Sequence, residues 1–304
     1  MNETLVQPRG LRLWWMAIRP KTLGLAISPV ILGAAIAWSG YGATFRPEVP
    51  LIIVLCAIAI QAGTNLFNDA QDHLNGTDDP ARMGPPRITA LGWALPHQVS
   101  TAALTAFLTA LLGGLYLIQI GGWPIFFGGL SALWAGYLYS RGPYPVSRSP
   151  FGEVVVIAFF GLFAVGGTVF LMTGRVPSST YLWGLVVGLP AGGVLMLNNI
   201  RDLDGDRRAG RRTLAILLGN GPARGVYIGS MLIPFVLIGL AAGGGLISPG
   251  ALAGLAALPL AIKIIRALSA APVGPALNPL LAKTVQFQFL LAISISLGLV
   301  IPGL

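Results

Sequence analysis

The chain has 304 residues, of which 55% are hydrophobic and only 10% charged, and its formal net charge is +9. Soluble globular proteins carry about 25% charged residues, so this composition excludes an ordinary water-soluble domain. Its abundance of apolar residues also excludes a disordered chain. We therefore expect an all-α, polytopic membrane protein whose single transmembrane domain occupies residues 1–304.

Nine stretches are apolar and long enough to form membrane-crossing helices, each of which needs about 20 residues. In chain order they cover residues 22–38, 50–66, 99–120, 123–139, 154–172, 181–197, 225–246, 251–268 and 284–301. Residues 1–21 precede the first helix as an N-terminal segment. Cys56 lies inside the second stretch, where a buried structural thiol is expected.

The basic residues predict the orientation of these helices. Of the 19 Lys and Arg residues, all but Arg46 and Arg175 fall in the N-terminal segment or near the ends of even-numbered helices. Because basic residues favour the cytoplasmic side, the N-terminus is expected in the cytoplasm and the C-terminus outside. Topology and anionic lipid account for the net charge, so nucleic-acid binding is not expected.

The Asp residues are confined to two windows, residues 69–79 and 202–206, which follow the second and sixth predicted helices on the cytoplasmic side. In the first window, Asn and Asp recur at i, i+3, i+4 and i+7, which places Asn65, Asn68, Asp69 and Asp72 on one helix face. This pattern predicts that the second helix continues beyond the membrane.

The second window repeats the pattern at i, i+4 and i+8, with Asn198, Asp202 and Asp206 on one face and Asp204 pointing away. Like charges one turn apart destabilise a helix, so a positive group is expected between the two windows. Hard divalent cations prefer oxygen ligands, and Mg²⁺ combines carboxylates with substrate phosphates. Solvated caps and turns are the simpler alternative, but they do not explain why Asp occurs nowhere else.

Two stretches of these windows are similar to a known family. Residues 65–72 (NLFNDAQD) and 198–207 (NNIRDLDGDR) resemble the two Asp-rich motifs of the UbiA superfamily of intramembrane aromatic prenyltransferases. Four further stretches resemble its 1,4-dihydroxy-2-naphthoate polyprenyltransferase branch. They are residues 17–22, residues 76–78 with 84–87, residues 142–145 with 152–154, and residues 210–215.

The resemblance implies a nine-helix UbiA-type bundle in the cell membrane that uses Mg²⁺, with two ions expected. The implied reaction transfers a polyprenyl group from polyprenyl diphosphate to 1,4-dihydroxy-2-naphthoate. It yields demethylmenaquinone, CO₂ and diphosphate, a step of menaquinone biosynthesis. The expected partners are these two substrates and the lipid bilayer.

The resemblance and the spacing together nominate the site residues. The first-choice metal ligands are Asn68, Asp72, Asp202 and Asp206, and the second-choice ligands are Asn65, Asp69, Asp78 and Asn198. The three Asp residues of the first set are also the catalytic candidates. The guanidinium fork matches phosphate oxygens, so the basic candidates for the diphosphate are Arg19, Lys21, Arg82, Arg87, Arg201 and Arg207. Tyr139 and Tyr144 are the candidates for the acceptor pocket.

Three alternatives remain open at this point. Val146, Ser147 and Arg148 stand where the naphthoate branch commonly has Leu-Ala-Tyr, so the acceptor could instead be 4-hydroxybenzoate, homogentisate, a glycerol phosphate or a porphyrin. A secondary transporter would place its polar groups near the membrane midplane, whereas here every Asp lies near one surface. A non-catalytic scaffold would not need turn-spaced Asp on two segments.

Overall fold

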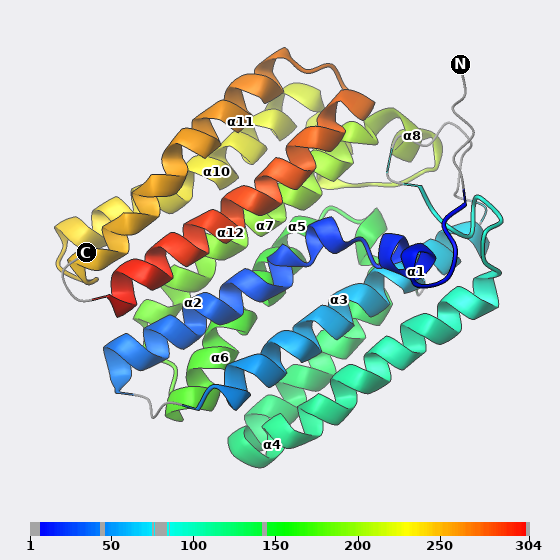
Figure 1. Ribbon diagram of the computed structural model, residues 1–304. Coiled ribbons are helices and arrows are strands. Elements are labelled where there is room, and N and C mark those ends of the chain that lie inside the picture. The colour runs from blue at the N-terminus through cyan, green and yellow to red at the C-terminus, as the bar shows by residue number, and fades with distance from the viewer. Residues whose placement is uncertain are drawn as a thin grey trace.

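A computed structural model describes residues 7–42, 46–74, 76, 84, 86–141 and 145–301 of the chain. Over these residues the chain is helical throughout, with no strand (Figure 1). An all-helical chain suits a bilayer because each helix satisfies its own backbone hydrogen bonds where no water is available. The all-α prediction is therefore confirmed.

Long helices alternate along the chain with short helical segments. In order, the elements are α1 (Leu11–Ala17), η1 (Pro20–Thr22), α2 (Gly24–Tyr41), α3 (Glu48–Leu74), α4 (Pro96–Ser140), η2 (Val146–Arg148), α5 (Gly152–Ile157), η3 (Ala158–Phe163), α6 (Ala164–Thr173), α7 (Ser179–Arg201), α8 (Leu203–Arg208), α9 (Leu214–Leu218), α10 (Asn220–Gly243), η4 (Pro249–Ala257), α11 (Leu258–Ala270), η5 (Pro275–Leu277) and α12 (Asn278–Val300).

Within the described ranges, eight helices are long and apolar enough to cross a membrane, compared with the nine that the sequence predicts. The difference lies in α4, which has 45 residues and contains a non-helical glycine, Gly122, with φ 62° and ψ −150°. A straight helix of that length would measure about 65 Å, twice the thickness of the hydrocarbon layer. In Figure 1 the chain instead turns back within α4, so this one element contains both stretches predicted at 99–120 and 123–139.

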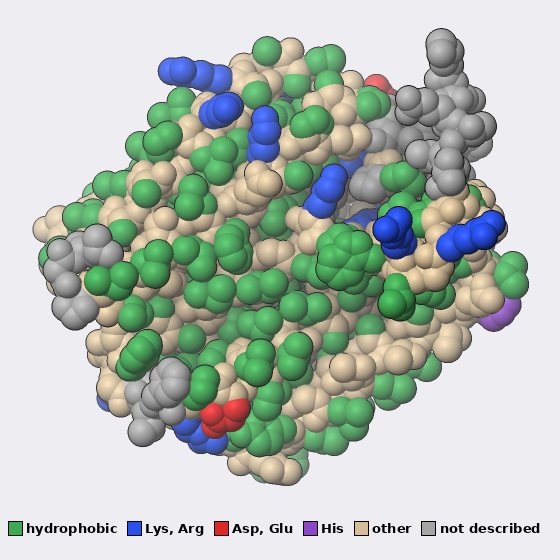
Figure 2. Space-filling model, viewed as in Figure 1, with side chains coloured by type: hydrophobic (Ala, Val, Ile, Leu, Met, Phe, Trp, Pro, Cys, Tyr) green, Lys and Arg blue, Asp and Glu red, His purple; other side chains and the backbone are tan. Residues whose placement is uncertain are grey.

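The surface of the bundle is largely apolar. Figure 2 shows hydrophobic side chains spread over the visible face, whereas Lys and Arg lie mainly in a band along its upper and right parts, with others at the lower left. The exposed fraction of large apolar side chains is high: it is 68% for Leu112, 71% for Trp123 and 70% for Leu240. Water would disfavour such a surface, whereas lipid does not. The chain is a multi-pass membrane protein.

The centre of the bundle is α7, which packs against α2, α5, α10 and α12. It also lies very close to η3, a π-helical segment that continues from α5 into α6. A Cβ atom on Gly161 of η3 would lie 2.3 Å from the carbonyl oxygen of Gly184 on α7, so only glycine fits this contact. π-helical turns often occur at functional sites, and η3 directs several aromatic side chains toward the cavity beside the Asp windows.

Candidate functional site

The two Asp windows meet at one end of the bundle, where Arg211 joins them. The Nη1 atom of Arg211 lies 3.2 Å from Oδ1 of Asp206, and its Nη2 atom lies 3.7 Å from Oδ1 of Asp72. Both Asp residues are buried. A positive group does stand between the windows, and in the structure it is this guanidinium. The motifs predicted no separate role for Arg211, although it belongs to the family-like stretch 210–215.

Asp72 pairs with a second guanidinium, that of Arg87. The Nη1 atom of Arg87 also donates a hydrogen bond of 3.1 Å to the carbonyl oxygen of Asn68, one turn earlier on α3. Arg87 is only 4% exposed. These contacts place one of the basic residues predicted from the sequence directly beside a predicted metal ligand.

Asp69 has a different environment from Asp72, although the two share a helix face. Its carboxylate accepts hydrogen bonds from the backbone N–H groups of Ile88 (3.1 Å) and Thr89 (3.2 Å), and another from the Thr89 hydroxyl. Asp69 is 2% exposed and is committed to these contacts. It fixes the turn that carries Arg87, and for Asp69 we propose this structural role in place of the second-choice metal ligand.

The second window begins at a break in the helix. α7 ends at Arg201, Asp202 takes a non-helical conformation with φ −92° and ψ 8°, and α8 begins at Leu203. The Asp206 N–H still donates a hydrogen bond of 2.8 Å to the Asp202 carbonyl, so the four-residue spacing persists across the break. Asp206 is buried and Asp204 is exposed, in keeping with the predicted difference between them.

Arg201 binds groups of the protein itself. Its Nε atom donates a hydrogen bond of 2.8 Å to Oδ1 of Asp202, and its Nη1 atom donates one of 3.0 Å to Oδ1 of Asn278 at the start of α12. The Arg201 side chain is 2% exposed. These contacts join α7 to α12 and orient Asp202, and we propose this role for Arg201 in place of a contact with the diphosphate.

Next to the joined windows is a cavity of about 400 Å³. Its polar lining includes Arg19, Thr22, Asn65, Asn68, Tyr139 and Asn198. The remaining walls are almost entirely apolar and come from α2, α3, α4, η3 and α7; they include Phe159, Phe160 and Phe163. A cavity that is polar on one part and apolar along the rest suits an amphipathic ligand with a long hydrocarbon tail.

Arg19 reaches this cavity through an uncommon backbone conformation. Among the described residues it is the one non-glycine residue with positive φ, at 56°. A left-handed backbone conformation in a residue other than glycine costs about 1–3 kcal/mol and often marks a functional position. The adjoining backbone is held by Asn65, whose Nδ2 donates a hydrogen bond of 3.0 Å to the carbonyl of Ile18.

The structure separates the remaining candidates. Lys21 and Arg207 are exposed and do not line the cavity. Tyr139 does line it. Asp78, Arg82 and Tyr144 lie outside the described residues.

The donor atoms are suited to Mg²⁺, which favours carboxylate and carbonyl oxygens. Asp72 and Asp206 are joined by one guanidinium, and the side chains of Asn68 and Asn198 line the adjacent cavity. In the described ranges, no three His, Cys, Asp or Glu side chains converge as a preformed metal site.

The chain is similar to known proteins along most of its length. The model of the UbiA prenyltransferase family matches residues 26–278. Proteins named 1,4-dihydroxy-2-naphthoate octaprenyltransferase are 34% identical in Mycobacterium tuberculosis, over 89% of this chain and 91% of the relative, and 32% identical in Escherichia coli, over 94% of each.

Solved structures share the fold. An apo UbiA homologue from Aeropyrum pernix K1 has a TM-score of 0.67 at 13% identity, covering 94% of this chain and 99% of that one. A UbiA homologue from Archaeoglobus fulgidus bound to GPP and Mg²⁺ has a TM-score of 0.65 at 15% identity, covering 93% and 99%. At these identities the likeness concerns the fold.

Proposed function

The chain belongs to the UbiA prenyltransferase family, and from this premise we propose that it transfers a polyprenyl group from polyprenyl diphosphate to 1,4-dihydroxy-2-naphthoate. The family and its relatives make it a prenyltransferase that acts on an aromatic acceptor. The naphthoate acceptor, the release of CO₂ and the use of two Mg²⁺ ions are parts of the proposal. The observation that supports it most is the amphipathic cavity beside the joined Asp windows.

The donor is proposed to bind with its tail among the apolar walls and its diphosphate at the polar part of the cavity. Arg19 lines that part, and Arg87 and Arg211 lie beside the carboxylates. Guanidinium groups bind phosphate oxygens with two parallel hydrogen bonds. Arg211, which joins Asp72 to Asp206, is proposed to turn toward the diphosphate when the donor binds.

Asn68, Asp72, Asp202 and Asp206 are the proposed ligands for Mg²⁺. When bound, the metal supplies Lewis-acid stabilisation of the negative charge on the departing diphosphate. Arg201 holds Asp202 in place, and Arg87 holds Asp72 at the end of α3. These two contacts keep the carboxylates oriented toward one charged substrate group, an arrangement that favours the charge of the transition state.

The bond changes of the proposed reaction balance without a further reactant. The allylic C–O bond of the donor breaks and the diphosphate leaves with the electron pair. The acceptor's carboxylated ring carbon forms the new C–C bond, and the carboxylate leaves as CO₂, returning its electrons to the ring. Phe159 and Phe160 on η3 exclude water from the developing allylic cation and can stabilise it through their π faces. Tyr139, which also lines the cavity, is proposed to contact the acceptor.

The acceptor assignment is tested by incubating the purified protein with Mg²⁺, a polyprenyl diphosphate and a panel of acceptors. The panel contains 1,4-dihydroxy-2-naphthoate, 4-hydroxybenzoate, homogentisate, glycerol phosphate and a porphyrin. We expect mass spectrometry to detect a decarboxylated, prenylated product from the naphthoate alone. A product from another acceptor, with none from the naphthoate, would overturn the assignment.

The proposed orientation places the N-terminus and the Asp windows in the cytoplasm. It can be tested in a Cys56→Ala background at two exposed positions, Ser178→Cys just before α7 and Ala209→Cys just after α8. We expect an impermeant thiol reagent to label the Ser178→Cys variant in intact cells, and the Ala209→Cys variant only after the membrane is opened. The reverse pattern would contradict the orientation.

A further inference from the structure

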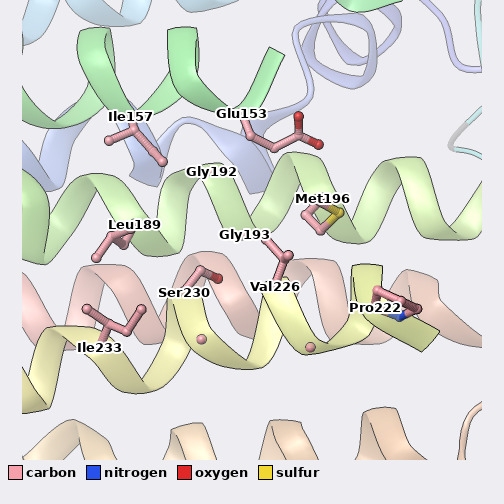
Figure 3. A pocket seen from close by; sticks show the side chains of 12 residues that line it. Glu153, Ile157, Leu189, Gly192, Gly193, Met196, Pro222, Val226, Ser230 and Ile233 are labelled. Carbon is pink, nitrogen blue, oxygen red and sulfur yellow. The ribbon is translucent and has the colours of Figure 1, made fainter. Parts of the chain in front are cut away.

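A second hollow lies on the opposite side of α7 from the cavity. Its volume is about 540 Å³, and it is bounded by α5 and η3, α7, and α10 (Figure 3). On α7 it is lined by Leu189, Gly192, Gly193 and Met196, whereas Ala191, Val194 and Asn198 line the cavity. At 100° per residue these two sets lie on opposite helix faces. We call the second hollow the α7–α10 groove.

One polar atom in the α7–α10 groove has no partner. Glu153, at the start of α5, is 5% exposed, and its Oε1 accepts a hydrogen bond of 2.8 Å from Nδ2 of Asn199. Its Oε2 is buried and makes no hydrogen bond within the described part of the chain. Figure 3 shows the carboxyl group at the end of the groove near Met196 and Pro222. A buried polar atom left unpaired costs about 1–3 kcal/mol, so a ligand that pairs with it would gain affinity.

The rest of the groove favours a flat, neutral ligand. Gly225 and Gly229 on α10 leave part of one wall without side chains, whereas Gly192 and Gly193 on α7 are covered by Ile157 and Ser230. Among the described residues no Lys or Arg lines the groove to hold a phosphate, and the Glu153 carboxylate would repel one. On α10, Val226 and Ile233 are each 44% exposed, so the groove opens toward lipid.

We propose that the α7–α10 groove binds a neutral, membrane-soluble hydroxyaromatic molecule with an isoprenoid chain, whose hydroxyl pairs with Oε2 of Glu153. A hydroxyl can donate to an ionised carboxylate or accept from a protonated one, so it satisfies Glu153 in either state. The ring lies against Gly225 and Gly229 of α10, and the chain extends toward lipid. The choice of a prenylated hydroquinone rests on the proposed function, because prenyl transfer with loss of CO₂ leaves both ring hydroxyls in place until the ring is oxidised to the quinone. The hydroxyl pairing does not rest on that function.

The groove can be narrowed by a substitution on α10. A Cβ atom on Gly225 meets nothing within 4 Å, so the side chain of Gly225→Leu can enter the groove. Gly239 lies on the same helix, is equally open and is outside the groove. Gly239→Leu is therefore the matched control, since both changes replace a helical glycine and raise helix propensity.

The test uses the full chain in nanodiscs, without Mg²⁺ or prenyl diphosphate. The probe is a naphthol with a geranyl chain and a photoreactive diazirine, and its O-methyl ether is the matched probe without a hydroxyl donor. We expect labelling of residues 222–233 by the naphthol, at least tenfold above the ether. Gly225→Leu should reduce this labelling at least tenfold, and Gly239→Leu should leave it unchanged. In Glu153→Gln the preference for the naphthol should disappear, because the new amide can donate to the ether.

Three outcomes would overturn the proposal: labelling that survives Gly225→Leu, labelling displaced by geranyl diphosphate with Mg²⁺, and labelling displaced by added phospholipid. The second outcome would place the probe in the cavity, and the third would make a lipid the occupant. Turnover is measured on the same preparation. Labelling without turnover rejects the proposed function alone, and turnover without labelling rejects the groove alone.

Discussion

The two Asp windows have similar compositions but are built differently. The first, up to Leu74, lies on the unbroken helix α3, where Asp72 faces Arg87 and Arg211 while Asp69 binds the backbone of the turn at Ile88 and Thr89. The second crosses a helix break, where Asp206 faces Arg211 and Asp204 is exposed. In each window one buried carboxylate faces Arg211, whereas a neighbour binds the backbone or faces outward. The role of a carboxylate in these windows is therefore indicated by the groups that face it and not by its residue type.

The largest effect is expected from removal of Mg²⁺, which both windows are proposed to bind. If both bind Mg²⁺ through Asp72 and Asp206, excess EDTA should abolish prenyl transfer, and added Mg²⁺ should restore it. Turnover is measured by mass spectrometry of the prenylated product. Full turnover after removal of the metal would contradict the joint site and leave only the guanidinium contacts to bind the diphosphate.

The next largest effect is a loss of kcat that distinguishes the buried Asp72 and Asp206 from the exposed Asp204. Asp72→Asn and Asp206→Asn keep the side-chain shape but remove a charge, and each should lower kcat at least a hundredfold, or about 3 kcal/mol of transition-state stabilisation. Asp204→Asn is the matched control, because Asp204 is exposed on the same short helix as Asp206, and its kcat should change less than about threefold. Similar losses in all three variants would contradict the assignment.

A smaller loss is expected where the windows are joined. Arg211→Gln removes the charge between Asp72 and Asp206, so KM for the prenyl diphosphate should rise about tenfold or more. Arg207→Gln is the control on the exposed face of α8. If the KM values for the diphosphate rise equally in both variants, the effect would come from the general positive potential and not from the bridge.

The smallest effect on kcat is expected at Asp69, where substitution should instead lower the stability of the fold. Asp69→Asn weakens three contacts to residues 88 and 89 and should destabilise the protein by about 1–3 kcal/mol. A lower melting temperature in detergent, with kcat per folded molecule within about fivefold of the parent, is the expected result. A hundredfold loss of kcat at an unchanged melting temperature would restore Asp69 as a metal ligand.

The sequence alone determined the membrane class and most of the helical spans, and it nominated the carboxylates that the structure brings together. Apolar stretches of about 20 residues can only become membrane-crossing helices, because lipid offers no partner for an open backbone. The spacing of Asp202, Asp204 and Asp206 was enough to separate a buried position from an exposed one, because side-chain direction follows helix geometry even across the break.

Only the tertiary structure decided the partners of these groups. The spacing of Asp69 and Asp72 places them on one helix face. Their different partners depend on how the segment after α3 folds back, since Asp69 accepts a hydrogen bond from Thr89 and Asp72 pairs with Arg87. Likewise Arg201 contacts Asn278 on a distant helix, and Arg211 rather than its neighbours reaches both windows. Such contacts depend on how segments far apart in the chain pack together, which the local periodicity of the sequence does not encode.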